Sequence, residues 1–177
     1  MKDLSKLLSL ILRHDAARFE VPLDPEGFAH LPDVLRAVRT RLPQTQLEDI
    51  LAVVRVVDPG KQRFTVDGDE IRANYGHSLA QRIEHEVAAP PSVLFHGTHE
   101  AALAAVLASG LRPMGRQYVH LTVEAALART IGARHGRAVV LRVDTASAAE
   151  AKVVFYRANP MFWLADFVPP AYLTRSP

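Results

Sequence analysis

The stretch from residue 90 to residue 122 constrains the fold most, because two short apolar runs flank a helical pattern. Residues 92–95 form an apolar run typical of a buried strand. Residues 100–109 then place apolar side chains at helical spacing, and Gly110 stands where a helix commonly ends. After a turn, residues 118–122 have the composition of a second strand. The stretch therefore predicts a strand–helix–strand unit.

A histidine lies in or directly after each of these two predicted strands. His96 follows the first strand together with Gly97 and Thr98, and His120 lies in the second, which Arg116 precedes. A single histidine in such a place is usually a hydrogen-bonded core residue. Two of them beside glycines and an arginine favour instead a cleft that binds an anionic, hydroxyl-rich ligand.

Residues 84–91 have the composition of a connector, which predicts a boundary between two lobes, residues 1–88 and 89–177. The sequence Ala-Ala-Pro-Pro at positions 88–91 is typical of a linker. The charge also changes there, because residues 1–90 hold 12 Lys and Arg against 14 Asp and Glu, whereas residues 91–177 hold 9 against 5. We therefore expect a slightly acidic first lobe and a basic second lobe.

The first lobe opens with a helical pattern whose apolar face is Leu4, Leu7, Leu8, Ile11 and Leu12. Asp3 or Ser5 is expected to cap this helix. Arg13 and His14 fall at its C-terminal end, where cations complement the helix dipole.

The rest of the first lobe predicts two more helices and a hairpin. Residues 19–23 are expected to be extended. Residues 31–42, opened by a proline, and residues 46–57, ended by Asp-Pro-Gly, have helical spacing. Asp-Gly-Asp at positions 67–69 joins two short strands. Three helices followed by a hairpin form the pattern of a winged helix, and by analogy with that fold the lobe would bind nucleic acid.

Charge limits how such a lobe could contact RNA. Because the lobe is net acidic, we expect local contacts through a few arginines such as Arg13 and Arg63. The segment after the hairpin, which contains Asn74, Gly76 and His77, has the composition of a tight turn.

The second lobe continues with short strands and few helices, which predicts a compact α+β domain. Residues 123–136 and 146–151 are expected to be helical, and residues 138–143 and 153–156 to be strands. A last strand is expected near residues 171–173.

Composition excludes some classes of site. The chain has no cysteine, which excludes disulfides and thiolate chemistry and disfavours a zinc site. The apolar run at the N-terminus is too short to span a membrane and lacks a signal-peptide cleavage pattern. We therefore expect a cytoplasmic protein without a zinc site.

These motifs, taken in order, resemble the Tpt1/KptA family of RNA 2′-phosphotransferases nearly from end to end. The pieces are Ser5-Lys6, Leu12-Arg13-His14, Lys61-Gln62-Arg63-Phe64, Ile71-Arg72-Ala73-Asn74, Gly76-His77-Ser78, His96-Gly97-Thr98, Gly110-Leu111, Pro113-Met114, Arg116, Val119-His120-Leu121, Phe155-Tyr156, Trp163-Leu164 and Val168-Pro169-Pro170. Any one of them is weak, but the ordered set is specific.

The resemblance implies a winged-helix lobe that holds the RNA phosphate, followed by an ADP-ribosyltransferase-like lobe with a small mixed or antiparallel sheet. It implies NAD as co-substrate and an RNA with an internal 2′-phosphate, of the tRNA splice-junction type, as substrate. The RNA phosphate would be ADP-ribosylated first. Its transfer would then release ADP-ribose 1″,2″-cyclic phosphate. No metal is implied, and we expect a monomer.

The resemblance also implies roles for particular residues. The four essential positions fall on Arg13, His14, Arg63 and Arg116. Fixed guanidiniums suit this chemistry because they stay charged and bind phosphate oxygens in bidentate fashion. The residues expected to bind NAD are His96, Gly97, Thr98, His120, Leu121 and Phe162, and those expected at the substrate or in a turn are Asn74, Gly76 and His77.

Some positions depart from the usual family pattern. Tyr75 stands in place of Gln, Tyr118 in place of His and Thr122 in place of Ser, and residues 159–162 differ from Asn-Gly-Val. Two alternative functions are compatible with these motifs. One is an ADP-ribosyltransferase that stops after the first step on a terminal phosphate of RNA or DNA. The other is a winged-helix binding module with a decayed second lobe, against which the four intact residues speak.

Overall fold

The computed structural model describes residues 1–55 and 62–176. The chain packs into two compact units, Met1–Glu84 and His85–Pro177. Each unit combines helices with an antiparallel sheet, as expected for the α+β class. Within the described ranges, no helix is long and apolar enough to cross a membrane.

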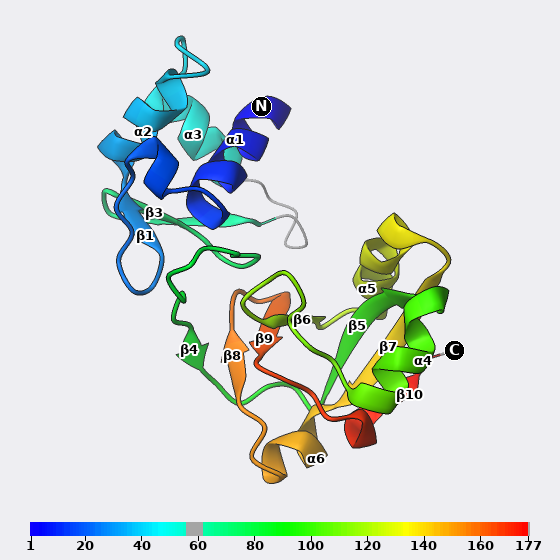
Figure 1. Cartoon of the computed structure of the whole chain (residues 1–177). Helices are drawn as coiled ribbons and strands as arrows, with labels where there is room; N and C mark the ends of the chain where they lie inside the picture. Colours follow the sequence, from blue (N-terminus) through cyan, green and yellow to red (C-terminus); the bar gives the residue numbers. More distant parts are fainter. Residues whose placement is uncertain (56–61, 177) are drawn as a thin grey trace. The chain divides into compact units, whose positions relative to one another are not determined.

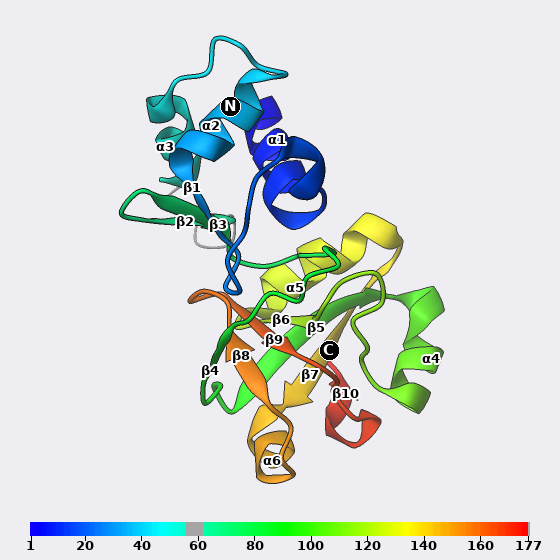
Figure 2. The same cartoon turned by 60° about the vertical axis from the view of Figure 1, so that its left-hand side comes forward.

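The first unit contains three helices, α1 (Lys2–Arg13), α2 (Leu31–Arg39) and α3 (Leu47–Val54). Figures 1 and 2 show them together on one side of a small sheet. The predicted apolar face of α1 is confirmed, because all five of its side chains are buried in the core of this unit. The predicted caps are wrong, since Met1 is the N-cap residue and no side chain caps the helix.

The sheet of the first unit contains β1 (Phe28–His30), β2 (Phe64–Asp67) and β3 (Glu70–Ala73) in the order β1-β3-β2. The predicted hairpin is confirmed, with Thr65 opposite Arg72. Its strands close the core over α1, because Phe64 and Ile71 are buried against the helical side chains.

One element of the first unit was predicted wrongly. The expected extended piece at residues 19–23 begins instead with a 3-10 turn, Ala17–Phe19. Glu20 follows in the left-handed region, with φ 54, which breaks any strand. The helix predicted over residues 46–57 is shorter in the structure, where α3 ends at Val54 with Arg55 as its C-cap. Asp58-Pro59-Gly60 and the motif residue Lys61 lie outside the described residues.

The second unit is built on a sheet in the order β10-β7-β5-β6-β9-β8-β4. Its strands are β4 (Glu86–Val87), β5 (Val93–His99), β6 (Val119–Thr122), β7 (Ala138–Asp144), β8 (Phe155–Arg157), β9 (Phe162–Ala165) and β10 (Leu173–Arg175). Its helices are α4 (Glu100–Ser109), α5 (Ala125–Gly132) and α6 (Thr145–Glu150), with 3-10 turns at Ala133–His135 and Pro170–Tyr172.

Two expectations for the second unit need correction. The predicted connector contains β4, which pairs with β8 in the second sheet, because a partner about 70 residues away supplies its hydrogen bonds. The first predicted strand does not end before His96. It continues to His99, because β7 pairs with it along its whole length, from Val93↔Asp144 to His99↔Ala138.

The strand pairing is shorter between β5 and β6 than between the other central strands. In the described part of the chain these strands are registered through one pair, Phe95↔Thr122, whereas β6 and β9 pair along all of both strands. The ladder therefore stops where His96 begins. Figure 1 shows these strands at the centre of the second unit.

Helix α5 approaches β5 unusually closely at two glycines. A Cβ atom on Gly97 would overlap the carbonyl oxygen of Ala128, and one on Gly132 would overlap the carbonyl oxygen of Thr98. Both obstacles are backbone atoms, which cannot rotate away as a side chain can. Gly97 is therefore required by packing, whatever else it does.

We expect the substitution Gly97→Ala to lower the free energy of unfolding by about 1–3 kcal/mol or more, because the added methyl group forces backbone atoms apart. Denaturant unfolding checks this. Gly115→Ala is a matched control, because nothing lies within 4 Å of the added atom. Equal losses in the two variants would contradict the packing argument.

Candidate functional site

Arg13 and His14 are placed by the C-terminal end of α1, as predicted. Arg13 is the last helical residue and His14 is the C-cap. Ser78 holds both of them: its backbone N–H donates to the Arg13 carbonyl at 2.9 Å, and its Oγ is hydrogen-bonded to His14 Nδ1 at 2.8 Å. The bond to Ser78 Oγ therefore orients the His14 ring.

The Arg13 guanidinium lies against aromatic rings. Its central carbon is 5.0 Å from the ring centroid of Tyr75 and 5.7 Å from that of Phe64. Gly76 adopts φ +89, and a Cβ there would lie 3.4 Å from Arg13 Nη1. The rings and the glycine backbone therefore restrict where the guanidinium can point, and cation–π attraction strengthens that restriction.

Arg63 is fixed from two sides. Its Nη1 donates to Ser5 Oγ on α1 at 3.2 Å. Its carbonyl accepts from the backbone N–H of Asn74 at 2.8 Å. The Asn74 side chain adds two bonds, accepting from Thr65 Oγ1 at 2.7 Å and donating to the Gln62 carbonyl at 3.3 Å. Asn74 therefore anchors the hairpin end that carries Arg63.

The segment 74–78 thus brings together the predicted site residues of the first unit. It contacts Arg13, His14 and Arg63 through Asn74, Tyr75, Gly76 and Ser78, while His77 is buried with 2% of its surface exposed. Sequence reasoning treated this segment mainly as a turn. The positioning contacts of Ser5, Tyr75 and Ser78 were missed, because no local pattern reveals contacts made across 58–64 residues.

His96 reaches across to β6 at the point where the ladder stops. Its Nδ1 donates to the His120 carbonyl at 2.9 Å. Burial lowers the pKa of His96, the bond to His120 opposes that shift, and the charge of Arg116 lowers the pKa further. The ring is therefore neutral near pH 7, with Nδ1 protonated and Nε2 able to accept a hydrogen bond from a hydroxyl.

The other residues predicted to bind NAD lie on β5, β6 and β9, and three of them are buried. Thr98 is buried at the end of β5, and Leu121 is completely buried in the core. Phe162 is buried at the start of β9, opposite Thr122. The Asn159 side chain accepts from the backbone N–H groups of residues 161 and 162 at 2.8 and 2.7 Å. This asparagine therefore fixes the loop that presents Phe162.

Arg116 and Tyr118 lie in the segment that leads into β6. Arg116 is exposed, and its charge acts on His96. Tyr118 is buried, with its ring 5.3 Å from the rings of His85 and Tyr156 in edge-to-face arrangements. This aromatic group packs the entry to β6 and so supports the position of His120.

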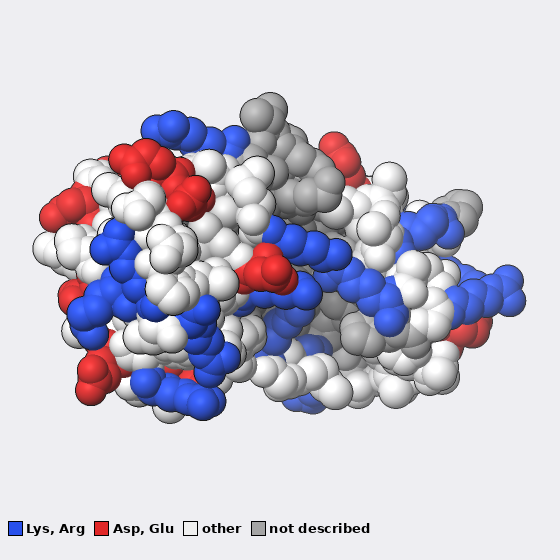
Figure 3. Space-filling model, turned by 90° about the horizontal axis from the view of Figure 1, so that it is seen from above, with Lys and Arg blue, Asp and Glu red and all other residues white. Residues whose placement is uncertain are grey.

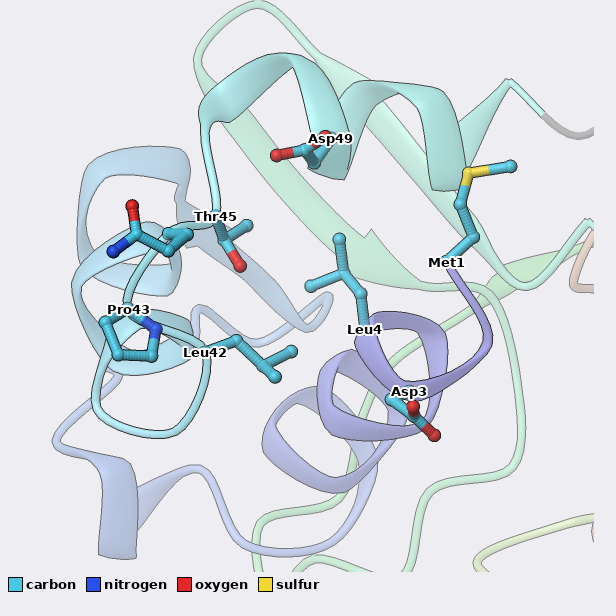
Figure 4. A pocket seen from close by; sticks show the side chains of 8 residues that line it. Met1, Asp3, Leu4, Leu42, Pro43, Thr45 and Asp49 are labelled. Atoms are coloured by element: carbon cyan, nitrogen blue, oxygen red, sulfur yellow. The ribbon is translucent and has the colours of Figure 1, made fainter.

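A cavity of about 420 Å³ lies elsewhere in the first unit. Figure 4 shows Leu4 and Leu42 along it, with the carboxylates of Asp3 and Asp49 nearby. Its lining contains two acids and no lysine or arginine. It is therefore poorly suited to a phosphate, and it includes none of the predicted site residues.

The fold and these contacts define an α+β protein with two groups of candidate site residues, Arg13, His14 and Arg63 in the first unit and His96, Arg116 and His120 in the second. In residues 1–55 and 62–176, no group of three His, Asp or Glu side chains could hold a metal ion. A family model described as "RNA 2'-phosphotransferase, Tpt1 / KptA family" matches residues 1–167.

Curated relatives agree with this match over nearly their whole length. A Hahella chejuensis protein named "Probable RNA 2'-phosphotransferase" is 38% identical over 176 residues, which cover 98% of this chain and 94% of that protein. Proteins of the same name from Thermococcus kodakarensis and Herpetosiphon aurantiacus are 38% and 39% identical, covering 98% and 96% of this chain and 96% and 93% of the relatives. The chain belongs to the Tpt1/KptA family of RNA 2′-phosphotransferases.

Proposed function

We propose that this chain is an NAD-dependent RNA 2′-phosphotransferase that removes an internal 2′-phosphate, of the kind left at a tRNA splice junction. The observation that carries the proposal is the common anchoring of Arg13, His14 and Arg63 by the segment 74–78. In this proposal residues 1–88 act as a winged-helix lobe for the RNA phosphate. Residues 89–177 act as an ADP-ribosyltransferase-like lobe for NAD.

The first step would attach ADP-ribose to the RNA. An oxygen of the 2′-phosphate attacks C1″ of the nicotinamide ribose, and the C–N bond to nicotinamide breaks. A neutral His96, with Nε2 able to accept from a hydroxyl, suits a ribose, and Thr98 offers a second polar group nearby. Arg13 and Arg63 would hold the phosphate dianion as nucleophile.

The second step would release the RNA. The 2″-hydroxyl of the transferred ribose attacks phosphorus, the bond to the RNA 2′-oxygen breaks, and that oxygen takes up a proton. Charge grows on the phosphoryl oxygens, so fixed guanidiniums stabilise the transition state without a metal. Arg13, Arg63 and Arg116 are assigned to this charge, and His14 to orientation or proton handling. The products are RNA with a free 2′-hydroxyl and ADP-ribose 1″,2″-cyclic phosphate.

The test is incubation of an RNA oligonucleotide carrying one internal 2′-phosphate with this protein and EDTA, with and without NAD. We expect 2′-hydroxyl RNA and nicotinamide only when NAD is present. A stable ADP-ribosylated RNA would show instead an ADP-ribosyltransferase that stops after the first step. Binding without any turnover would show a binding module. Activity that needs Mg²⁺ would contradict the assignment of the charge to arginines.

The lowered pKa of His96 predicts how NAD binding depends on pH. The neutral ring accepts a hydroxyl proton, whereas the imidazolium cannot, so affinity should be constant above the ordinary value of 6.5 and fall as pH drops through the lowered pKa. Losing this hydrogen bond should cost on the order of 1–3 kcal/mol. Calorimetric titration of NAD at several pH values measures it.

The neighbouring groups make a control necessary, because His120 and Arg116 lie close to the same ring. His96→Gln should bind NAD more weakly near pH 7 and lack the acidic decline. If NAD affinity falls by the same amount at acidic pH in the variant, a group other than His96 causes the pH dependence. An unchanged NAD affinity in His96→Gln would count against this histidine as a ligand.

A further inference from the structure

Helix α1 presents a polar stripe that ends at Arg13. At 3.6 residues per turn, the side chains of Lys2, Ser5, Lys6, Ser9 and Arg13 fall within a sector of about 100°. The five buried apolar residues occupy the opposite side. The stripe therefore lies on the face that α1 turns away from the core.

Other contacts extend this stripe. Arg63 from the hairpin donates to Ser5 Oγ at 3.2 Å, so its guanidinium lies on the same face of α1. Ser9 Oγ donates back to the Ser5 carbonyl at 2.9 Å, within the stripe. Lys2 and Lys6 are exposed, while Ser5, Ser9 and Arg13 are partly buried. Cations and hydroxyl groups thus alternate along the helix and finish at a predicted site residue.

Helix stability does not explain the two lysines. Lys2 lies in the first turn of α1, where the helix dipole disfavours a cation, and Lys6 follows one turn later, where the dipole does not favour a cation. Within the described residues neither lysine forms an ion pair, and Asp3 is the one acid in α1. Two cations near the positive end of a helix instead build a local positive potential, which attracts anions.

The dimensions suit a nucleic-acid strand. Lys6 and Lys2 lie about 10 and 16 Å before Arg13 along the helix axis, at about 1.5 Å per residue. Such a length spans several consecutive phosphates of one strand. Figure 3 shows Asp and Glu interspersed among Lys and Arg at the left of the face in view, so the surface there is not broadly basic. A narrow stripe of cations on one helix therefore suits a local contact with RNA.

We propose that Lys2 and Lys6 of the α1 stripe, together with the hydroxyl groups of Ser5 and Ser9, bind the backbone phosphates of single-stranded RNA that flank the 2′-phosphorylated nucleotide, while Arg13 and Arg63 hold the 2′-phosphate itself. The proposal rests on the proposed function, because it places that nucleotide at Arg13. Lys2 and Lys6 supply charge for successive phosphates, and Ser5 holds Arg63 in the stripe. The partner is thus an RNA strand that extends beyond the reacting nucleotide.

The experiment measures RNA affinity by fluorescence anisotropy, without NAD, over a range of salt concentrations. The probes are a longer single-stranded RNA with one internal 2′-phosphate and a dinucleotide with the same phosphate. Each phosphate contact to a single strand contributes about 0.7 to the slope of log affinity against log salt. We expect Lys6→Gln to reduce that slope by about 0.7 for the longer RNA, and Lys2→Gln with Lys6→Gln by about 1.4.

Matched variants separate this contact from unspecific effects. Lys6→Arg should keep the slope, because it keeps the charge. Lys152→Asn removes one exposed lysine from the second unit, at a position with φ 69 that asparagine tolerates, and should also keep it. Circular dichroism on each variant verifies that the helix is intact.

An unchanged slope in the double variant would overturn the proposal, as would an equal loss of affinity for the dinucleotide and the longer RNA. These results do not depend on catalysis. A wild-type protein that binds RNA with the expected slopes but never removes the 2′-phosphate would refute the proposed function and still support the stripe as an RNA surface.

Discussion

Arg13→Ala should slow removal of the 2′-phosphate by about 10²–10³-fold, the usual cost of losing one fixed donor to a charged transition state. The structure explains why water is a poor substitute for the Arg13 guanidinium in the variant. The guanidinium is held between the rings of Tyr75 and Phe64 and against the backbone of Gly76, so its direction is set before substrate binds. Water in its place would have neither the charge nor the fixed orientation.

The measurement is single-turnover product formation from a 2′-phosphorylated oligonucleotide with saturating NAD. Arg18→Ala is the matched control, because Arg18 is exposed and pairs with Asp15 at 3.6 Å on the surface. Arg13→Lys should recover little, since an ammonium cannot reproduce the bidentate fork. Tyr75→Leu should lose part of the rate. An Arg13→Ala protein as active as Arg18→Ala would contradict the role of this arginine.

The sequence allowed the helices and the hairpin of the first unit to be predicted well, because their information is local. The apolar spacing of α1 decides which side is buried, and Asp67-Gly68-Asp69 decides where β2 turns into β3. The same spacing also predicts that Arg13 and His14 end the helix. These features depend on neighbours in sequence, which periodicity reports directly.

Features that depend on distant partners could not be predicted in this way. β4 is only two residues long and exposed, and it is a strand because β8 pairs with it. β5 continues through His96, Gly97 and Thr98, although Gly97 has low strand propensity, because β7 supplies the hydrogen bonds. Family resemblance located these three residues, but only the tertiary contacts show that Gly97 also serves packing against α5.

The candidate site also combines features that are local in the sequence with features that depend on distant partners. Family resemblance located Arg13, His14, Arg63 and Arg116, whose residue types suit phosphate chemistry. The positioning of Arg13, His14 and Arg63 by Ser5, Asn74 and Ser78 requires the folded chain, because each hydrogen bond joins residues that are not neighbours in the sequence. The pKa shift of His96 likewise requires burial and the nearby Arg116, neither of which a motif contains.

Arg63→Ala and Arg116→Ala should slow the second chemical step more than the first, so that ADP-ribosylated 2′-phospho-RNA accumulates. Departure of nicotinamide mainly requires an accessible C1″ and a phosphate in line with the breaking bond. Transfer to the 2″-hydroxyl instead places growing charge on the phosphoryl oxygens, which fixed guanidiniums stabilise. Arg63 is hydrogen-bonded to Ser5 and the charge of Arg116 acts on His96, whereas Arg13 packs against the rings of Tyr75 and Phe64.

The intermediate should be visible by denaturing electrophoresis of samples quenched at successive times, because a loss of about 10²–10³-fold in one step leaves its substrate to build up. Arg112→Ala is the matched control for Arg116. Arg112 is exposed in the same segment, and its guanidinium lies 4.9 Å from the ring centroid of Phe167. Lysine at position 63 or 116 should restore the rate only in part. If both alanine variants slow the two steps equally, with no intermediate at any time, the arginines serve the first step as much as the second, because each must already orient the phosphate for its attack on C1″.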